Sequence, residues 1–462
     1  MKQIPLIIGA LLFSTFFYNQ NIGLNLSLFT LLTIILLVIT NTSAFKKQST
    51  IFISLAYLTS GITVFLYDSN LTVFTNILSF ITLVGSVSNH SSSVYIQWIN
   101  GLYTTIVAAF SQYYDSLNTE IKNVQKQKID YLYWAKLILI PTVILIIFST
   151  LYRIGNPKFD ALISQVDLSF INFQWILLSG LGYYLLYNIT NPITIEPITE
   201  LDTKTGNELQ KKEELLVSQE KLKKENQLGI VLMFSLNVLI VLYLITDMMY
   251  LSELHNMNGT ELSKQVHNGV NALIVSIIFA ILILLYFFRG DLNFFKQNKS
   301  LKNLAFVWIF LNINLVVLTA IKNFEYIQSF GFTYKRIGVL VYLLLTLIGL
   351  ITTFIKVQNI KNLWFLFRKN SQIAFIILII ASSINWDNTI TNYNINYAEQ
   401  TDVDYLLSLS NNNIFILKQY ANNSKINFEQ KFDIDTKHLN YLQELQQNSW
   451  QEMVYDNLIV KE

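Results

Sequence analysis

The chain contains no cysteine, which excludes disulfide bonds, thiolate metal sites and cysteine nucleophiles. Charge is also scarce, because 13% of the 462 residues are charged whereas a soluble domain usually carries about a quarter. The formal net charge is +2, so a role in nucleic-acid binding has no electrostatic support. These scarcities point away from a soluble enzyme or a nucleic-acid-binding protein.

Common catalytic motifs are missing as well. The sequence holds no GxxxxGK[ST] phosphate loop, no HExxH, no GxSxG and no GxGxxG. We therefore predict no catalytic residue, no metal, no cofactor and no enzymatic activity.

Hydrophobic residues make up 52% of the chain, and most of them fall in long uncharged runs. A helix needs about 20 apolar residues to cross about 30 Å of hydrocarbon. The runs predict an all-α, polytopic transmembrane bundle with about eleven spans. These are Ile4–Tyr18, Ile22–Thr40, Ile51–Tyr67, Leu71–Ser88, Leu137–Tyr152, Leu168–Ile189, Leu228–Thr246, Val270–Phe288, Leu304–Ile321, Ile337–Ile355 and Ser371–Trp386.

Two runs allow a second interpretation. The first resembles a signal peptide, but no small-x-small cleavage site follows before Asn19, so an uncleaved span is favoured. Val94–Phe110 is uncharged but interrupted by polar residues, and we interpret it as an interfacial helix anchored by Trp98 and not as a further span.

Lysine and arginine predict the orientation. With a cytoplasmic N-terminus, the inner segments hold 20 of the 32 basic residues and the outer loops hold six. Because cytoplasmic loops are enriched in positive charge, we predict the N-terminus inside and the C-terminus outside. The predicted location is the inner (cytoplasmic) membrane, with the lipid bilayer as the first partner.

Two soluble regions flank the spans. The inner loop 190–227 is rich in Lys and Glu, and from Asn207 it is expected to form a helix that runs into the next span, with Glu220 and Lys224 as i,i+4 partners. Residues 387–462 carry eleven acids and five bases, and Asp402 precedes an apolar run as a helix cap would. We predict a membrane domain over 1–386 and a small, acidic, helical, extracytoplasmic segment over 387–462. Either region could contact a protein partner.

The connector between Leu228–Thr246 and Val270–Phe288 is the first candidate site. Asn258-Gly-Thr-Glu261 has the form of a capping box, so a helix should begin near Gly259. Its titratable residues support three interpretations: structural hydrogen bonding, a ligand or proton-sensing site, or a divalent metal site, whose spacing matches no standard motif. The candidate residues are Asp247, Glu253, His255, Glu261 and His267.

Lys335 and Arg336 form the second candidate, because positive charge is scarce on the predicted outer face. They could contact lipid headgroup phosphates, clamp an anionic ligand, or pair with acids of the connector or the tail.

Several blocks resemble known families. They are Leu236-Asn-Val-Leu-Ile-Val-Leu-Tyr243, Thr260-Glu-Leu-Ser-Lys-Gln-Val-His-Asn-Gly-Val270, Asn314-Leu-Val-Val-Leu-Thr-Ala-Ile-Lys322, Phe330-Gly-Phe-Thr-Tyr-Lys-Arg-Ile337, Asn385-Trp-Asp-Asn-Thr-Ile-Thr-Asn-Tyr-Asn-Ile395 and Asp402-Val-Asp-Tyr-Leu-Leu-Ser-Leu-Ser410. Over residues 228–410, with the membrane blocks in 228–386, the chain resembles the bacterial membrane families called domains of unknown function 4153 and 4173. The resemblance implies a bacterial cytoplasmic-membrane protein and no particular activity.

The favoured hypothesis is a non-enzymatic role in sensing, scaffolding or envelope assembly, with the outer loops and the tail as a recognition face. The alternative is a transporter or channel for a small polar or ionic solute, with Asp247 and the connector lining the path. A transporter should place polar groups near the middle of the membrane, whereas the ionisable groups here fall near its outer edge.

Overall fold

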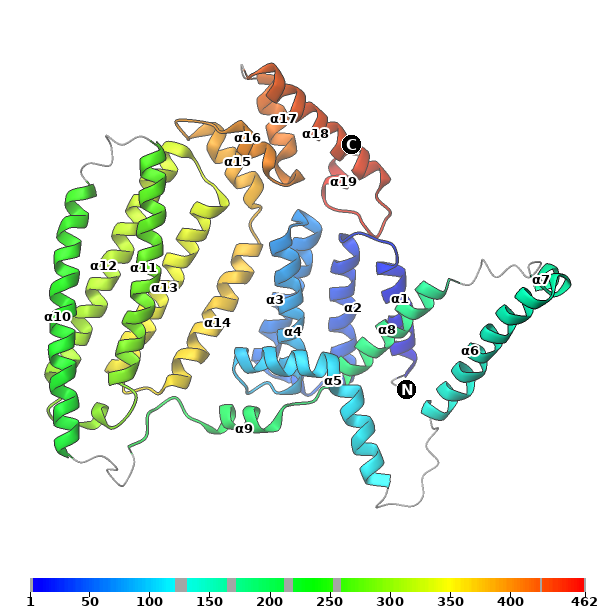
Figure 1. Cartoon of the computed structure of the whole chain (residues 1–462), viewed down its shortest axis with the longest axis horizontal. Helices are drawn as coiled ribbons and strands as arrows, with labels where there is room; N and C mark the ends of the chain where they lie inside the picture. The colour runs from blue at the N-terminus through cyan, green and yellow to red at the C-terminus, as the bar shows by residue number, and fades with distance from the viewer. Residues whose placement is uncertain are drawn as a thin grey trace. The chain divides into compact units, whose positions relative to one another are not determined.

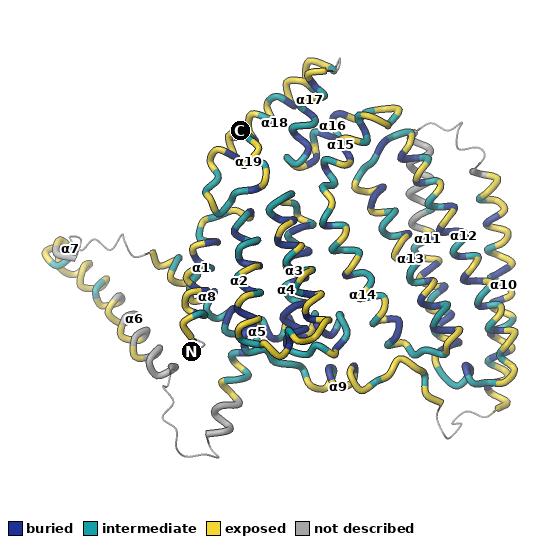
Figure 2. Tube along the Cα trace, turned by 180° about the vertical axis from the view of Figure 1, so that it is seen from behind, coloured by how far each residue is buried: buried dark blue, intermediate teal, exposed yellow. Residues whose placement is uncertain are grey.

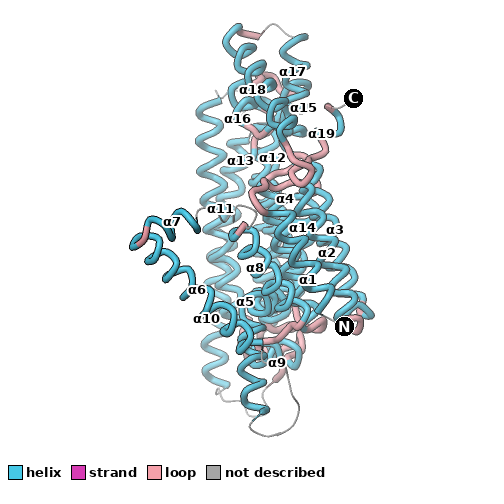
Figure 3. Tube along the Cα trace, turned by 90° about the vertical axis from the view of Figure 1, so that its right-hand side faces the viewer, coloured by secondary structure: helices cyan, strands magenta, loops and turns pink. Residues whose placement is uncertain are grey.

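The computed structural model describes residues 3–120, 131–163, 172–211, 219–251, 259–423 and 426–460. Within these ranges every regular element is a helix, as Figure 3 shows, and the one β-type pairing is an isolated bridge between Glu208 and Lys361. The predicted all-α class is confirmed.

The chain divides into two compact units, and the smaller one comprises Met1–Asn19 and Thr105–Asn191. Its helices are α1 (Gln3–Phe17), the second part of α5 (Val94–Glu120), α6 (Tyr131–Gly155), α7 (Pro157–Ile163) and α8 (Phe173–Thr190). Small residues join α1 to α8: the hydroxyls of Ser14 and Ser179 are 2.6 Å apart, and Gly182 lies against the ring of Phe13. Small residues let helices approach closely in lipid, where no hydrophobic force drives them together.

The larger unit comprises Gln20–Thr104 and Pro192–Glu462. Its helices are α2 (Leu24–Thr40), α3 (Gln48–Tyr67), α4 (Asn70–Ser88), the first part of α5, α9 (Glu196–Lys204), α10 (Gln219–Leu251), α11 (Gly259–Phe287), α12 (Lys299–Phe330), α13 (Tyr334–Gln358), α14 (Leu363–Ser382), α15 (Trp386–Asn396), α16 (Val403–Ser408), α17 (Ile414–Asn423), α18 (Phe428–Gln447) and α19 (Asp456–Ile459), with 3-10 turns at Ala44–Lys46, Asp291–Phe294 and Asn411–Asn413. Figure 1 shows that, in this unit, α15 to α19 lie at one end of the long helices and α9 lies at the other.

Among the described residues, six helices are long and apolar enough to cross a membrane: Gln48–Tyr67, Asn70–Ser88, Gln219–Met249, Lys299–Phe330, Tyr334–Gln358 and Leu363–Ser382. Gln3–Phe17, Leu24–Thr40 and Ala272–Phe287 are shorter apolar helices. The chain is therefore a helical membrane protein. The count of eleven spans and the orientation stay predictions.

Burial differs between these helices. Figure 2 shows more of α4 buried than of α10 and α14: 61% of the apolar part of α4 is buried, against 17% in each of the other two. α10 and α14 therefore expose long apolar stripes. Exposed Val231, Phe234 and Leu239 of α10, and Ile376 and Ile380 of α14, belong to such stripes. Lipid tails are as apolar as these side chains, so the stripes fit a surface that faces hydrocarbon.

The predicted interfacial helix Val94–Phe110 is part of α5, which continues to Glu120. Trp98 is held by α4, because its Nε1 donates to Thr82 Oγ1 at 2.9 Å. The polar residues of this stretch are buried against the chain around α9: Asn100 Nδ2 donates to Thr199 Oγ1 at 2.9 Å, and Thr104 Oγ1 donates to the carbonyl of Ile193 at 2.8 Å. These contacts, and not exposure to water, explain why the apolar pattern is interrupted.

Helices α4 and α5 cross at two glycines. A Cβ on Gly85 would lie 1.9 Å from the carbonyl oxygen of Gln97, and one on Gly101 would lie 2.0 Å from that of Ile81. No side chain fits at either place without moving a backbone.

Replacing Gly85 by alanine should therefore lower the free energy of unfolding by about 1–3 kcal/mol or more, the usual cost of overpacking. The matched control is Gly349→Ala within α13, where nothing lies within 4 Å of the added Cβ. Thermal unfolding in detergent checks the pair, and equal midpoints would contradict the tight crossing.

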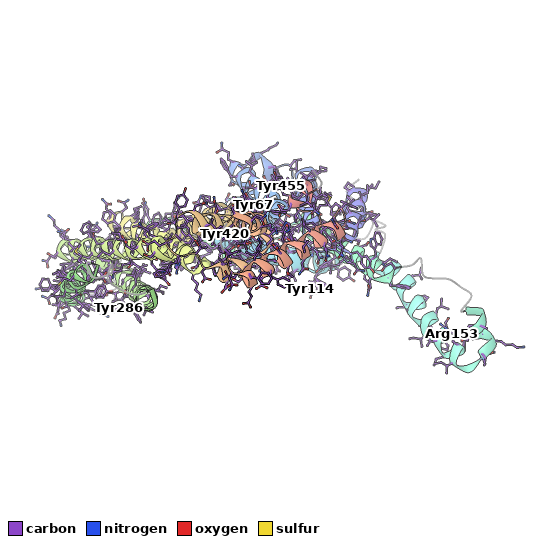
Figure 4. All side chains as sticks on the ribbon, turned by 90° about the horizontal axis from the view of Figure 1, so that it is seen from above. Tyr67, Tyr114, Arg153, Tyr286, Tyr420 and Tyr455 are labelled. Atoms are coloured by element: carbon purple, nitrogen blue, oxygen red, sulfur yellow. The ribbon has the colours of Figure 1, made fainter. Side chains whose placement is uncertain are left out.

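The segment after Trp386 packs on the ends of the long helices. Ile337 of α13 shares one apolar core with this segment, including Ile390, Val403, Leu406, Leu409, Leu417, Ala421 and Ile434. The backbone N–H groups of Leu24 and Asn25 donate to the carbonyls of Met453 and Gln451, each at 2.8 Å, and Tyr455 N–H donates to the carbonyl of Phe65 at 2.9 Å. Figure 4, seen from above, shows Tyr455 beside Tyr67, which ends α3. The acidic segment is thus tied by its backbone to α2 and α3, and its extracytoplasmic position stays a prediction.

Some predicted bounds are correct and others are not. α11 begins at Gly259, Asp402 Oδ1 caps α16 by accepting from Tyr405 N–H at 2.9 Å, and Lys224 pairs with Glu220 at 2.9 Å. The helix expected from Asn207 is wrong over 207–211, where Leu209 N–H donates to the carbonyl of Ile360. The last span begins at Leu363 and ends at Ser382, because Asn362 and Asn385 cap α14 and α15 as separate helices.

Candidate functional site

A cavity with a volume of about 820 Å³ and many polar lining residues lies in the larger unit, where the C-terminal segment meets the long helices. Three regions line it: the turn between α3 and α4, the turn between α12 and α13, and the chain from Ile384 to Asn412. The lining residues are Tyr67, Asp68, Ser69, Asn70, Leu71, Tyr326, Thr333, Tyr334, Lys335, Arg336, Ile384, Asn385, Trp386, Asp387, Tyr405, Ser408, Leu409, Ser410 and Asn412.

The turn between α12 and α13 is fixed at a glycine. Gly331 has φ +75°, in the left-handed region that favours glycine, and a Cβ there would lie 2.4 Å from Asn394 Oδ1. Asn394 holds the next residue, because its Oδ1 accepts from Phe332 N–H at 2.6 Å and its Nδ2 donates to the Phe332 carbonyl at 2.9 Å. Thr333 then caps α13 by accepting from Arg336 N–H at 3.3 Å. The position of Arg336 is thus set by α15 as well as by its own turn.

Arg336 is 9% exposed. Its Nη1 donates to the carbonyls of Phe330, at 2.6 Å, and Gly331, and its Cζ lies 3.8 Å from the centroid of the Tyr326 ring. Within the described residues its Nε and Nη2 donate no hydrogen bond, and no carboxylate pairs with the guanidinium. Neither nitrogen is among the fully buried polar atoms that lack a hydrogen-bond partner. Arg336 therefore brings a buried positive charge with unused donors to the cavity wall.

Asp387 supplies the buried negative charge of the same cavity and is 3% exposed. Its Oδ1 accepts from the hydroxyl of Tyr334 at 2.6 Å, and its Oδ2 accepts from the hydroxyl of Ser410. Tyr405 lines the same cavity, and its hydroxyl accepts from Tyr334 N–H at 2.9 Å. Burial raises the pKa of Tyr405, and the charge of Asp387 raises it further, so this phenol stays protonated at neutral pH.

Asp68 ends α3 with a left-handed φ of 34°. It borders this cavity and a smaller one of about 140 Å³, which Glu444 and Asp456 also line. Burial, and to a lesser extent the negative charge of Glu444, together raise the pKa of Asp68 to about 6. The charge of the cavity wall therefore depends on pH near 6.

The structure separates the predicted site residues. Glu253 and His255 lie outside the described residues, while Glu261 and His267 lie on α11 without described side chains. Asp247 pairs with Lys322 of α12 and does not line the cavity.

Lys335 and Arg336 both line the cavity, but Lys335 is exposed. Neither forms an ion pair within the described ranges. Sequence reasoning assigned no role to Asp387, Tyr334 or Ser410, although Asp387 lies within a block quoted for the family resemblance.

A second polar cluster lies at the other end of the larger unit. Asp202 of α9 accepts at Oδ2 from the N–H and hydroxyl of Ser93, at 2.7 and 2.9 Å, and at Oδ1 from the hydroxyl of Tyr95 at 3.0 Å. Arg368 of α14 donates from Nε to Asp202 Oδ1 at 3.0 Å and from Nη2 to the Asp202 carbonyl. This cluster joins α5, α9 and α14, and it satisfies its own charges.

Comparison with known proteins gives a family. The family model described as a domain of unknown function (DUF4153) matches residues 6–420, which includes every residue named above as lining the large cavity. No curated protein and no solved structure matches the chain.

Proposed function

This chain belongs to the DUF4153 family, a domain of unknown function, and from that premise we propose that it is a non-enzymatic recognition protein. Its large cavity binds a small polar ligand that carries an anionic group. Binding there would serve a sensing or envelope-assembly role, with the C-terminal segment forming part of the binding wall.

The observation that carries this proposal is the state of Arg336. A buried charge without a partner is costly, and a guanidinium presents its donors in a fork that matches carboxylate and phosphate geometry. Here Arg336 lines a cavity large enough for a small molecule, while the Nη1 hydrogen bonds and the Tyr326 ring hold the guanidinium in place. An anionic ligand would supply the missing acceptors, and the exposed Lys335 would add positive charge at the rim.

The other polar groups of the cavity favour binding over catalysis. Both carboxylate oxygens of Asp387 accept hydrogen bonds from protein hydroxyls, which fixes it as a structural acceptor and leaves it poorly placed as a base. The hydroxyl, amide and aromatic side chains around it suit a ligand with several hydroxyl groups and an apolar face.

We further propose that the protein resides in a bacterial cytoplasmic membrane with the cavity on its outer side. The distribution of basic residues supports this orientation. The Lys- and Glu-rich segment 190–227 would then face the cytoplasm, where it or, on the outer side, the acidic C-terminal segment could contact a protein partner.

A transporter or channel is the second candidate function, because Asp247 and Lys322 form an ion pair between two membrane helices. Ionisable residues inside a membrane often mark a solute or proton path. Flux into liposomes of the purified protein, compared with Asp247→Asn, tests this alternative. Solute-dependent flux that is lost in the variant would establish transport.

The binding proposal is tested by isothermal titration of the detergent-purified protein with glucuronate and glycerol 1-phosphate, against glucose and glycerol as neutral counterparts. Binding of an anionic probe is expected, and Arg336→Gln should weaken it about 10- to 100-fold, the value of a charge-assisted hydrogen bond. Arg336→Lys retains the positive charge but loses the forked donors, so its affinity should lie between that of the wild type and that of Arg336→Gln.

A second variant separates binding from folding, because Arg336 also holds the backbone of its turn. Ser408 is exposed and lines the cavity, so Ser408→Trp should fill the cavity and block binding without touching Arg336. The control is Arg289→Gln, whose guanidinium lies outside the cavity on the ring of Tyr286. Equal affinity for anionic and neutral probes, or unchanged binding in Arg336→Gln and Ser408→Trp, would overturn the proposal.

A further inference from the structure

A second large cavity, of about 710 Å³, lies in the larger unit near α9, at the end opposite the C-terminal segment. Its walls come from α3, the loop between α4 and α5, the start of α5, α9 with the chain just after it, and α14. Two of these helices, Gln48–Tyr67 and Leu363–Ser382, are candidate membrane spans. The cavity is therefore an open groove that begins beside α9 and continues between two membrane helices.

The end of the groove near α9 is polar and positively charged. His90, Ser91 and Lys369 line it, and Ser91 and Lys369 are exposed. Lys369 forms no ion pair within the described part of the chain, whereas the neighbouring Arg368 is neutralised by Asp202. One uncompensated ammonium group and a hydroxyl thus remain at this end.

The rest of the groove is apolar. Phe52 of α3 is 69% exposed, and Ile376 and Ile380 of α14 are 49% and 58% exposed, yet all three line the groove. Lys369 and Ile380 are about 16 Å apart along α14 at 1.5 Å per residue. The walls therefore change from cationic to apolar over a length that matches the hydrocarbon depth of one bilayer leaflet, about 15 Å.

We propose that this groove holds a phospholipid, with the headgroup phosphate at Lys369 and Ser91 and one acyl chain along Phe52, Ile376 and Ile380. A groove between membrane helices does not stay empty, and filling it with water would cost free energy because these side chains are apolar. A lone alkyl chain would leave Lys369 without an anion, and a soluble phosphate would leave the apolar wall exposed. Only an amphiphile with an anionic head satisfies both parts.

The same reasoning disfavours a protein helix as the occupant. A helix from a second copy or a partner would cover the apolar stripe, but it would have to place an acidic residue at the single position beside Lys369. The surrounding bilayer supplies a phosphate beside an acyl chain at that depth without such a requirement.

The test uses the full-length protein purified in a mild detergent and examined by native mass spectrometry. Retained phospholipid is expected, and delipidated protein should regain thermal stability with phosphatidylglycerol. Phosphatidylcholine should be less effective, because its phosphate is screened by its own cation. Inorganic phosphate resembles only the headgroup of the proposed ligand and dodecane resembles only its acyl chain, so neither should raise the thermal stability.

Two variants probe the two ends of the groove. Lys369→Glu should lower retained phosphatidylglycerol at least about fivefold, and Ile376→Trp should do the same by filling the apolar part. Lys299→Glu and Ile351→Trp are the matched controls, since these residues are exposed on α12 and α13 and neither lines the groove.

Equal retention of phospholipid in all four variants would overturn the proposal. A shift with inorganic phosphate alone would assign the polar end to a soluble anion and would also overturn it. A stable dimer that loses its association in Ile376→Trp, with no phospholipid bound, would assign the groove to a second copy instead.

Discussion

Replacing Arg368 by methionine is expected to lower the free energy of unfolding by about 3–5 kcal/mol, the cost of leaving a buried charge without its partner. The side chain of Asp202 is 2% exposed, and Arg368 contributes its only cation within the described residues. Arg368 also donates to Asn207 Oδ1 at 2.7 Å, so the substitution removes the hydrogen bonds that this side chain makes to α9 and to the chain just after it. Chemical unfolding in detergent measures the loss.

The control for this prediction is Arg289→Met. Arg289 is half-exposed and its contact with Glu225 is 3.4 Å long, so its loss should cost about 1 kcal/mol or less. The double variant Arg368→Met/Asp202→Asn should recover part of the stability, because the uncompensated carboxylate is then removed. If the single and double variants are equally unstable, the ion pair is not the source of the effect.

The pH dependence follows from the same carboxylate. Burial alone would raise the pKa of Asp202, but hydrogen bonds from Ser93, Arg368 and Tyr95 outweigh burial and hold the pKa below its ordinary value. A depressed pKa in the folded state means that the unfolded state binds the proton more readily. The stability from Asp202 is therefore present above the ordinary aspartate pKa of about 4 and is lost as the pH falls below it. The difference between wild type and Arg368→Met should shrink over that range.

The helices were predictable from the sequence because their signals are local. Long apolar runs gave α2 to α4 and α13 close to their observed bounds, and a capping residue marked the start of α16. The runs placed α10, α11 and α12 but fell short of their lengths, because α10 and α12 extend beyond their runs at both ends and α11 begins well before its run. The helix predicted over 207–211 was wrong because the structure there depends on distant contacts. Its Lys- and Glu-rich continuation suits a helix, but hydrogen bonds with the chain between α13 and α14, from Ile360 to Asn362, hold it extended. No sequence pattern near Asn207 indicates that this stretch pairs with residues about 150 positions later in the chain.

The candidate site depended on distant contacts and was only partly predictable. Scarcity of positive charge singled out Lys335 and Arg336, yet sequence could not say that one is exposed and the other buried, because consecutive helical residues point about 100° apart. Asp387 and Asp202 gave no signal of their own. Their partners Ser410 and Arg368 are 23 and 166 residues away, and their roles exist only once the C-terminal segment and α9 have docked.

Replacing Lys322 by methionine is expected to lower the free energy of unfolding by about 3–5 kcal/mol, because Asp247 would keep a carboxylate beside lipid without its ammonium partner. The two side chains are 15% and 11% exposed and join α12 to α10. The double variant Lys322→Met/Asp247→Leu should recover most of the loss, since apolar packing often replaces a buried ion pair without cost. Thermal unfolding in detergent of the two single variants and the double variant gives the coupling between the residues.

A large coupling with normal folding of the double variant would make the pair a structural tie between two helices. If the double variant folds as well as the wild type yet loses a solute flux that the wild type carries, the pair belongs to a transport path. The recognition proposal for the large cavity would then no longer describe the protein's main activity.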